Sequence, residues 1–142
     1  MRIHLGGSSR QSLVAARAQL DAAVKGASSA SASELSAHLF FAAEVFATNT
    51  SLRRAFTDAS RDASSKSALV KDLFGSKISS SAADLLAAVA GLRWSAAGDL
   101  VIVIEQLAIE AEASAANVDG ALDRLESEFF EVSRLIADNF EL

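Results

Sequence analysis

The sequence has no cysteine and no proline among its 142 residues, and only 7 residues are glycine. Without cysteine there can be no disulfide bond, no thiolate nucleophile and no zinc or iron–sulfur site with cysteine ligands. Without proline, and with glycines only where segments would end, nothing in the backbone interrupts helices. These absences and the abundance of alanine predict an all-α fold that is held together by packing.

Long hydrophobic runs are also missing. The longest strongly apolar stretch, Leu100 to Ile104, is far shorter than the roughly 20 residues that a helix needs to cross a bilayer. The N-terminus lacks the continuous apolar core of a signal peptide. We therefore expect a soluble chain that is neither exported nor inserted directly into a membrane.

Acidic residues are concentrated in the last third of the chain. Residues 99–142 carry 2 basic and 11 acidic side chains, and the whole chain has a net charge of −5. Phosphate groups would be repelled by this part, and the small basic surplus of residues 1–98 forms no basic stripe. The charge pattern therefore argues against nucleic acid and favours a protein partner.

Apolar residues recur at helical spacing and predict a bundle of about six to seven short helices. The expected starts are Ser8 or Ser9, Ser31 or Ser33, Thr50 or Ser51, Ala63, Ser79 to Ser81, Asp99, and the residues after Gly120. The expected ends are Gly26, Asn49, the residues before Asp58, Gly75, Trp94, Val118 and the last residues of the chain, with Gly98 as a separator. The predicted core stripe of the first helix is Leu13, Val14, Ala16, Leu20 and Val24.

The sixth expected helix opens with LVIVI, residues 100–104, which local propensity alone would allow as a strand. Helix-compatible residues continue without a turn signal, whereas strands usually stop after about 4–8 residues, so we predict a helix. One apolar stripe contains Leu100, Val103, Ile104, Leu107, Ala108 and Ala111, and a second contains Val101, Ile102 and Ile109. A helix that is apolar on two faces is expected to be covered on both.

The end of the chain resembles an earlier part of it. A shift of 90 residues places 35–52 over 125–142, with ATNTSL over ADNFEL, and the apolar pattern is kept. We interpret residues 1–7 as a flexible leader and residues 8–118 as one helical module. Residues 99–142 are then the first two helices of a second copy, truncated after them, and the two modules share the helix 99–118.

Three segments together resemble a known family. They read LRRAFTDASRDASSKSALVKDLFGSKIS (52–79), LRWSAAGDLV (92–101) and LDRLESEFFEVSRLIADNFEL (122–142). They are similar to the δ subunit of bacterial F-type ATP synthase, the family of the mitochondrial oligomycin-sensitivity-conferring protein, in its long actinobacterial form with a duplicated N-terminal module. The resemblance covers about residues 8–142, and 52–94 is its most specific part.

The resemblance implies a non-catalytic stator component of the peripheral stalk, without a cofactor. Family members sit on the catalytic head, grip N-terminal helices of the α subunit in a groove between their first and fifth helices, and join b-type stalk subunits. The implied location is peripheral, at the cytoplasmic face of the bacterial plasma membrane.

Motifs for chemistry are weak. His4 and His38 are the only histidines, and Glu34 is the one carboxylate at helical ligand spacing from His38, so a surface or boundary role is favoured over a metal site. Gly75 to Lys77 lacks the upstream glycine and the preceding strand of a phosphate loop. The carboxylates of the last two helices lack the Glu-x-x-His motif of a di-metal bundle. We therefore expect no catalytic residue and no metal.

The candidate partner-binding residues lie on and before the sixth helix. Trp94 either anchors the helices against each other or contacts the stalk. Ile102, Glu105, Ile109 and Glu112 recur on one side, where they could face a partner helix or the seventh helix, and Val101 belongs to the second apolar stripe. An oligomer of the isolated chain is compatible with that stripe. The alternative function is a free-standing helical adaptor or ligand-binding bundle.

Overall fold

The computed structural model describes residues 5–118 and contains, over that range, six α-helices and no strand. They are α1 (Gly7–Val24), α2 (Ser29–Ala47), α3 (Thr50–Thr57), α4 (Ala63–Phe74), α5 (Ser80–Ala90) and α6 (Ala97–Val118). The prediction of an all-α fold is confirmed, and LVIVI is part of α6 as expected. The first four residues of the expected leader and the expected seventh helix lie outside the described residues.

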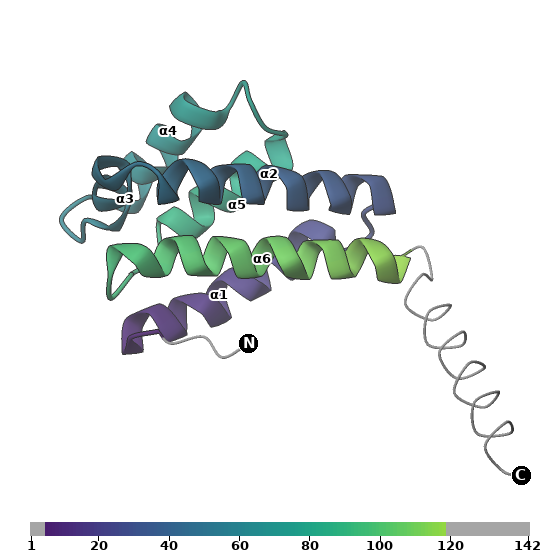
Figure 1. Ribbon diagram of the computed structural model, residues 1–142, viewed down its shortest axis with the longest axis horizontal. Helices are drawn as coiled ribbons and strands as arrows, with labels where there is room; N and C mark the ends of the chain where they lie inside the picture. The colour runs from purple at the N-terminus through teal and green to yellow at the C-terminus, as the bar shows by residue number, and fades with distance from the viewer. Residues whose placement is uncertain (1–4, 119–142) are drawn as a thin grey trace, which may run out of the picture.

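The two longest helices form the centre of the molecule. α2 and α6 lie side by side and run in opposite directions (Figure 1). α1 packs against α6 and α5, while α3 packs against α6 and α2. α4 packs mainly against α5. The sixth helix is therefore flanked by α1 on one side and by α2 and α3 on the other, but the expected cover over its second apolar face is incomplete, since Ile109 is exposed.

Three phenylalanine rings from three helices join α2, α3 and α4. The Phe46 ring centroid lies 5.0 Å from that of Phe56 and 5.7 Å from that of Phe74. The Phe46–Phe56 pair is edge-to-face, an arrangement that adds to the free energy gained from burial. All three side chains are at most 2% exposed, so they form a continuous part of the core.

The aliphatic core follows the sequence pattern in α6 but not fully in α1. All six residues of the first predicted stripe of α6 are buried. In α1, Ala16 and Leu20 are buried, whereas Val14 is 68% exposed, so its assignment to the core stripe was wrong. Val14 lies six residues before Leu20, which at 3.6 residues per turn places it on another side of the helix.

Polar side chains set most of the helix starts. Asn49, Asp62 and Ser79 cap α3, α4 and α5 by accepting a backbone N–H of the first turn. The serine-rich run before α2 was predicted to cap at Ser31 or Ser33. Instead the Oγ of Ser28 accepts the N–H of Ser31 at 3.1 Å, and the helix starts earlier. Several serines in a row offer equivalent caps, and packing selects one.

Three further boundaries differ from the prediction. α1 begins at Gly7, inside the expected leader, and Gly6 precedes it without a side-chain cap, so neither Ser8 nor Ser9 caps this helix. α5 ends at Ala90 instead of reaching Trp94, and after Gly91 the α-helical bonding gives way to a tighter bond from the N–H of Leu92 to the carbonyl of Val89. Gly98 does not separate two helices but belongs to the first turn of α6. Trp94 therefore lies in the connection between α5 and α6, and the direction of its side chain is not set by the spacing of a helix.

The cap of α4 predicts a pH-dependent stability. Hydrogen bonds from the N–H of Ser65 and the hydroxyl of Ser64 lower the pKa of Asp62 below its ordinary value of 3.8. The ionised carboxylate therefore stabilises the fold above that value, and this contribution is lost as the pH falls through the lower pKa of the folded state. Near neutral pH, we expect the free energy of unfolding in urea to be larger for wild type than for Asp62→Asn. Below about pH 4 this difference between the two proteins should disappear.

Asp72→Asn is the matched control, because Asp72 is an exposed carboxylate of α4 that caps no helix. An advantage of wild type over Asp62→Asn that stays constant from neutral to strongly acid pH would contradict the prediction.

Candidate protein-binding surfaces

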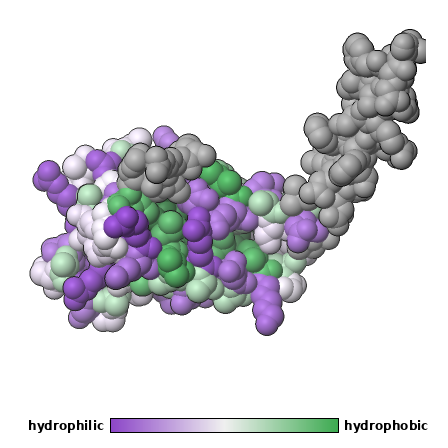
Figure 2. All heavy atoms as spheres, turned by 90° about the horizontal axis from the view of Figure 1, so that it is seen from below, coloured by the Kyte–Doolittle hydropathy of each residue, from purple (hydrophilic) through white to green (hydrophobic). Residues whose placement is uncertain are grey.

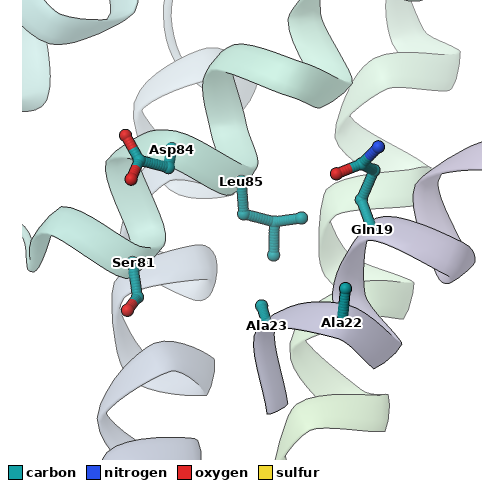
Figure 3. Close-up of a pocket in the computed structure, with 6 residues that line it drawn as sticks. All are labelled: Gln19, Ala22, Ala23, Ser81, Asp84 and Leu85. Carbon is teal, nitrogen blue, oxygen red and sulfur yellow. The ribbon is translucent and has the colours of Figure 1, made fainter. Parts of the chain in front are cut away.

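An open groove lies between α1 and α5 (Figure 3). It encloses about 280 Å³ and is lined by residues from about one turn of each helix. These residues are Gln19, Ala22 and Ala23 of α1, and Ser81, Asp84 and Leu85 of α5. On both helices they follow the same i, i+3, i+4 spacing, which places the three side chains on one face.

The groove has an apolar floor and a polar rim. Leu85 is only 3% exposed, and its side chain extends from α5 toward α1. Ala22 is exposed and Ala23 is half-buried, so these small side chains of α1 form the accessible apolar surface of the groove, and Leu85 lies beneath them. Gln19, Ser81 and Asp84 are exposed. The arrangement can therefore take up an apolar side chain and offer hydrogen bonds around it.

Asp84 supplies the one charge of this lining. Its carboxylate lies 3.7 Å from the ammonium group of Lys71, with side-chain exposures of 71% and 60%. Exposed pairs of this kind contribute at most about 1 kcal/mol. Asp84 is therefore available to a basic group of a ligand.

α6 is held in a fixed rotation by polar side chains of α1 and α2. Nε of Arg17 donates to both carboxylate oxygens of Glu110 at 3.1 Å. The buried hydroxyl of Ser36 donates to the carbonyl of Ala108 at 2.6 Å. These bonds connect the two flanks of α6 to different neighbours, and they determine which of its residues face outward.

The outward side of α6 carries the predicted partner-binding residues. Ile109 is 53% exposed, Glu105 is exposed and Ile102 is half-buried. Glu112 is exposed and accepts a hydrogen bond from the hydroxyl of Ser33 at 3.2 Å. The structure thus brings these four residues to one side, and their role in partner binding stays a prediction.

Val101 is separated from that side. It is half-buried and packs against the core. It also lines a second open cavity, of about 410 Å³, together with Arg53 and Arg54 of α3. The second apolar stripe of α6 is therefore divided, because Val101 turns toward α3 while Ile102 and Ile109 remain on the outer side.

Trp94 is 9% exposed and belongs to the core. The segment around it is tied to the first turns of α1, since Ser12 donates to the carbonyl of Arg93 and the N–H of Ser95 donates to Oγ of Ser9 at 2.7 Å. Trp94 therefore anchors the connection between α5 and α6, which is the first of the two roles that the sequence suggested. A contact of Trp94 with the stalk stays a prediction.

His38 has a structural partner. Its Nδ1 accepts the N–H of Ser79 at 2.9 Å, and Ser79 caps α5. The side chain thereby links α2 to the start of α5, as the predicted boundary role requires. Over residues 5–118 no group of His, Asp and Glu side chains is arranged to hold a metal ion.

Apolar and hydrophilic side chains both reach the surface on the α1 side. Figure 2 shows apolar areas interspersed with hydrophilic side chains on the face viewed from below.

In the part of the chain that the structure describes, no helix combines the length and the hydrophobicity that a membrane crossing needs.

Sequence reasoning did not find the groove residues individually. Their signal is the repeated spacing of small and polar residues on α1 and α5, and in a chain so rich in alanine and serine this signal is not distinctive. What makes the six residues a site is the packing of α1 against α5, and these helices are separated by more than fifty residues.

Comparison with known proteins gives consistent matches. The chain is 39% identical to the ATP synthase subunit delta of Streptomyces coelicolor over 136 residues, which cover 96% of this chain and 49% of that protein. It is 37% identical to the same subunit of Streptomyces avermitilis over 133 residues, covering 94% and 48%. For Frankia casuarinae the identity is 34% over 140 residues, covering 96% and 51%. The chain thus spans about half the length of these curated relatives, and no family model matches it.

Proposed function

Because this chain belongs, over nearly all of its length, to the family of ATP synthase δ subunits, we propose that it is a structural, non-catalytic part of an ATP synthase. Its role is that of a stator component in the peripheral stalk, at the cytoplasmic face of the bacterial plasma membrane. The consistent identity to the δ subunits of actinobacteria is the single observation that carries this proposal.

The groove between α1 and α5 is the proposed binding site for the N-terminal helix of the α subunit. Leu85 and the small Ala22 and Ala23 suit an apolar side chain from one face of an amphipathic helix. Asp84 suits a basic residue beside that face, because its pair with Lys71 is largely exposed. These features support a groove that recognises a helix through one apolar anchor and a charged rim.

A titration tests the proposal. A synthetic peptide with the sequence of the first residues of the α subunit from the same organism is added to the 142-residue chain and followed by calorimetry. We expect saturable one-to-one binding, with a gain in helical circular dichroism as the peptide orders. A peptide of the same composition in scrambled order is the control. No heat beyond that of the scrambled peptide would contradict the assignment of the partner.

The outer side of α6 is proposed as the start of a second helical module. In the described module the first helix, α1, packs mainly against α5 and α6. If α6 is the first helix of the second copy, the helices that cover Ile102 and Ile109 correspond to the fifth and sixth of that copy. These would come from sequence beyond the 142 residues, which span about half of the relatives.

This interpretation predicts that the effect of Ile109→Ser depends on chain length. In the 142-residue chain we expect a loss of less than about 0.5 kcal/mol of unfolding free energy, as for other exposed positions. In a chain completed to the full length of the relatives we expect a loss of about 1–3 kcal/mol, because the side chain becomes buried. Urea unfolding of both chains measures the difference.

Val14→Ser is the control for Ile109→Ser. Val14 is an exposed aliphatic residue of α1, and its replacement should have little effect in either chain. Equal losses for Ile109→Ser in the two chains would contradict the second module.

A further inference from the structure

A third cavity, of about 350 Å³, lies on the side of the bundle where four segments meet. They are the first turn of α1, the connection between α3 and α4, the first turns of α4, and the connection between α5 and α6. Ala63 and Gly91 bring α4 and the end of α5 close together, since a Cβ on Gly91 would lie 3.1 Å from that of Ala63. None of the surfaces described above includes this cavity.

The lining of this cavity is strongly basic. Arg61, Lys66 and Arg93 all line it, and its lining within the described residues contains no acidic side chain. The hydroxyl-bearing Thr57 and Ser8 also belong to the lining. Three cationic groups around one hollow repel each other, and an anion between them would remove that repulsion.

Lys66 is the most unusual of the three. It is only 4% exposed, and lysine is almost never buried so far unless it is paired. Among residues 5–118 it has no ion pair and no hydrogen bond from its ammonium group, and burial lowers its pKa. The charge of Asp58 acts in the opposite direction and raises the pKa of Lys66. Asp58 is exposed, and its carboxylate accepts two hydrogen bonds from Ser60. The charge of Lys66 is thus compensated only in part.

Trp94 lines the same cavity and carries a buried donor without a partner. Its indole Nε1 is the one buried side-chain nitrogen or oxygen of the described residues that has no hydrogen-bond partner. An indole N–H can only donate, so it requires an acceptor. Leu92 lines the cavity beside it and adds an apolar wall. The lining thus combines three cationic side chains and an unpaired donor with no carboxylate.

We propose that this cavity binds a phosphate group, held by Lys66, Arg61 and Arg93, with Trp94 beside it. A phosphate offers several acceptor oxygens, and guanidinium groups bind it through paired hydrogen bonds. The volume exceeds that of one phosphate ion and falls in the range of small-molecule pockets, so a phosphate monoester such as a nucleotide fits as well as free phosphate. The proposal does not depend on the partner proposed for the groove between α1 and α5.

Intrinsic fluorescence reports on this site directly, because Trp94 is the only tryptophan and the chain has no tyrosine. The 142-residue protein is titrated with inorganic phosphate, with ATP and with AMP, each against sodium chloride at equal ionic strength. We expect a saturable change in Trp94 emission with at least one of the three, and none with chloride. Comparison of free phosphate with the two nucleotides distinguishes the two sources of the phosphate group.

The variant Arg61→Gln/Arg93→Gln removes two exposed cations of the rim without touching the core, and we expect its affinity to fall at least about tenfold. Lys66→Met should abolish saturation; where its circular dichroism shows that it does not fold, the double variant decides alone. Lys77→Gln is the control, because it removes an exposed positive charge outside the cavity. The proposal is overturned by a wild-type titration without saturation up to about 10 mM, or by equal losses of affinity in the double variant and in Lys77→Gln.

Discussion

Replacing Ala22 by tryptophan is expected to weaken binding of the α-subunit N-terminal peptide by at least about a hundredfold while the bundle stays folded. Ala22 is exposed on α1 and lines the groove above Leu85, so a large ring at this position occupies the volume that an apolar anchor needs. Calorimetric titration with the peptide measures the loss. Thermal unfolding by circular dichroism shows whether the helices remain.

The matched control for this substitution is Ala37→Trp. Ala37 is an exposed alanine within α2 and does not line the groove. The same change in size and hydrophobicity at Ala37 should leave the affinity for the peptide within about twofold of wild type, since surface substitutions away from a site have small effects. Equal binding by Ala22→Trp and Ala37→Trp would rule out the groove as the site of the α-subunit helix.

The second large effect concerns stability. Phe46→Ala is expected to lower the free energy of unfolding by about 3–5 kcal/mol. The ring is 1% exposed and contacts Phe56 of α3 and Phe74 of α4, so its removal leaves a cavity where three helices meet. Domains of this size are stable by only about 5–15 kcal/mol, so the variant should unfold at a much lower urea concentration.

Phe40→Ala provides the comparison within the same helix. Phe40 is 45% exposed, and its replacement should cost less than about 1.5 kcal/mol because much of its surface is already in water. Equal losses for Phe40→Ala and Phe46→Ala would show that the phenylalanine cluster does not determine the stability of the bundle.

The phenylalanine cluster and the groove proposed for partner binding lie in different parts of the molecule. The phenylalanine cluster lies among α2, α3 and α4, whereas the groove lies between α1 and α5. The proposed stator role requires that the chain bind its partners without unfolding under torque. Separating the core from the contact surface lets the surface keep small residues, such as Ala22 and Ala23, without weakening the core.

The helices and many of their boundaries could be predicted from the sequence, because the signals are local. Ser79 caps α5 as predicted, α4 begins at the expected Ala63, and LVIVI is followed by a long helix-compatible run. The errors came where local signals are degenerate. The run of serines before α2 offered several possible caps. Val14 is apolar, but it does not lie on the face of α1 that packs on α5 and α6.

Binding features were predicted only where one helix carries them. Ile102, Glu105, Ile109 and Glu112 share the outer side of α6 because helical spacing alone places them together. The groove and the basic cavity combine residues from helices and connections far apart in the chain. Nothing in the sequence around Lys66 indicates its burial, since a lysine in an amphipathic helix is expected to face water.

The sequence by itself therefore determined the all-α class, the resemblance to a family, the approximate extent of most described helices and the buried apolar face of α6, because each depends on residues close together in the chain. Only the tertiary structure decided which helices meet. The packing of α1 on α5 creates the groove, and the meeting of four segments brings Lys66, Arg61, Arg93 and Trp94 around one cavity. The physical reason is that spacing along a helix fixes the direction of each side chain, whereas the neighbour that it faces is set by how all six described helices share one core.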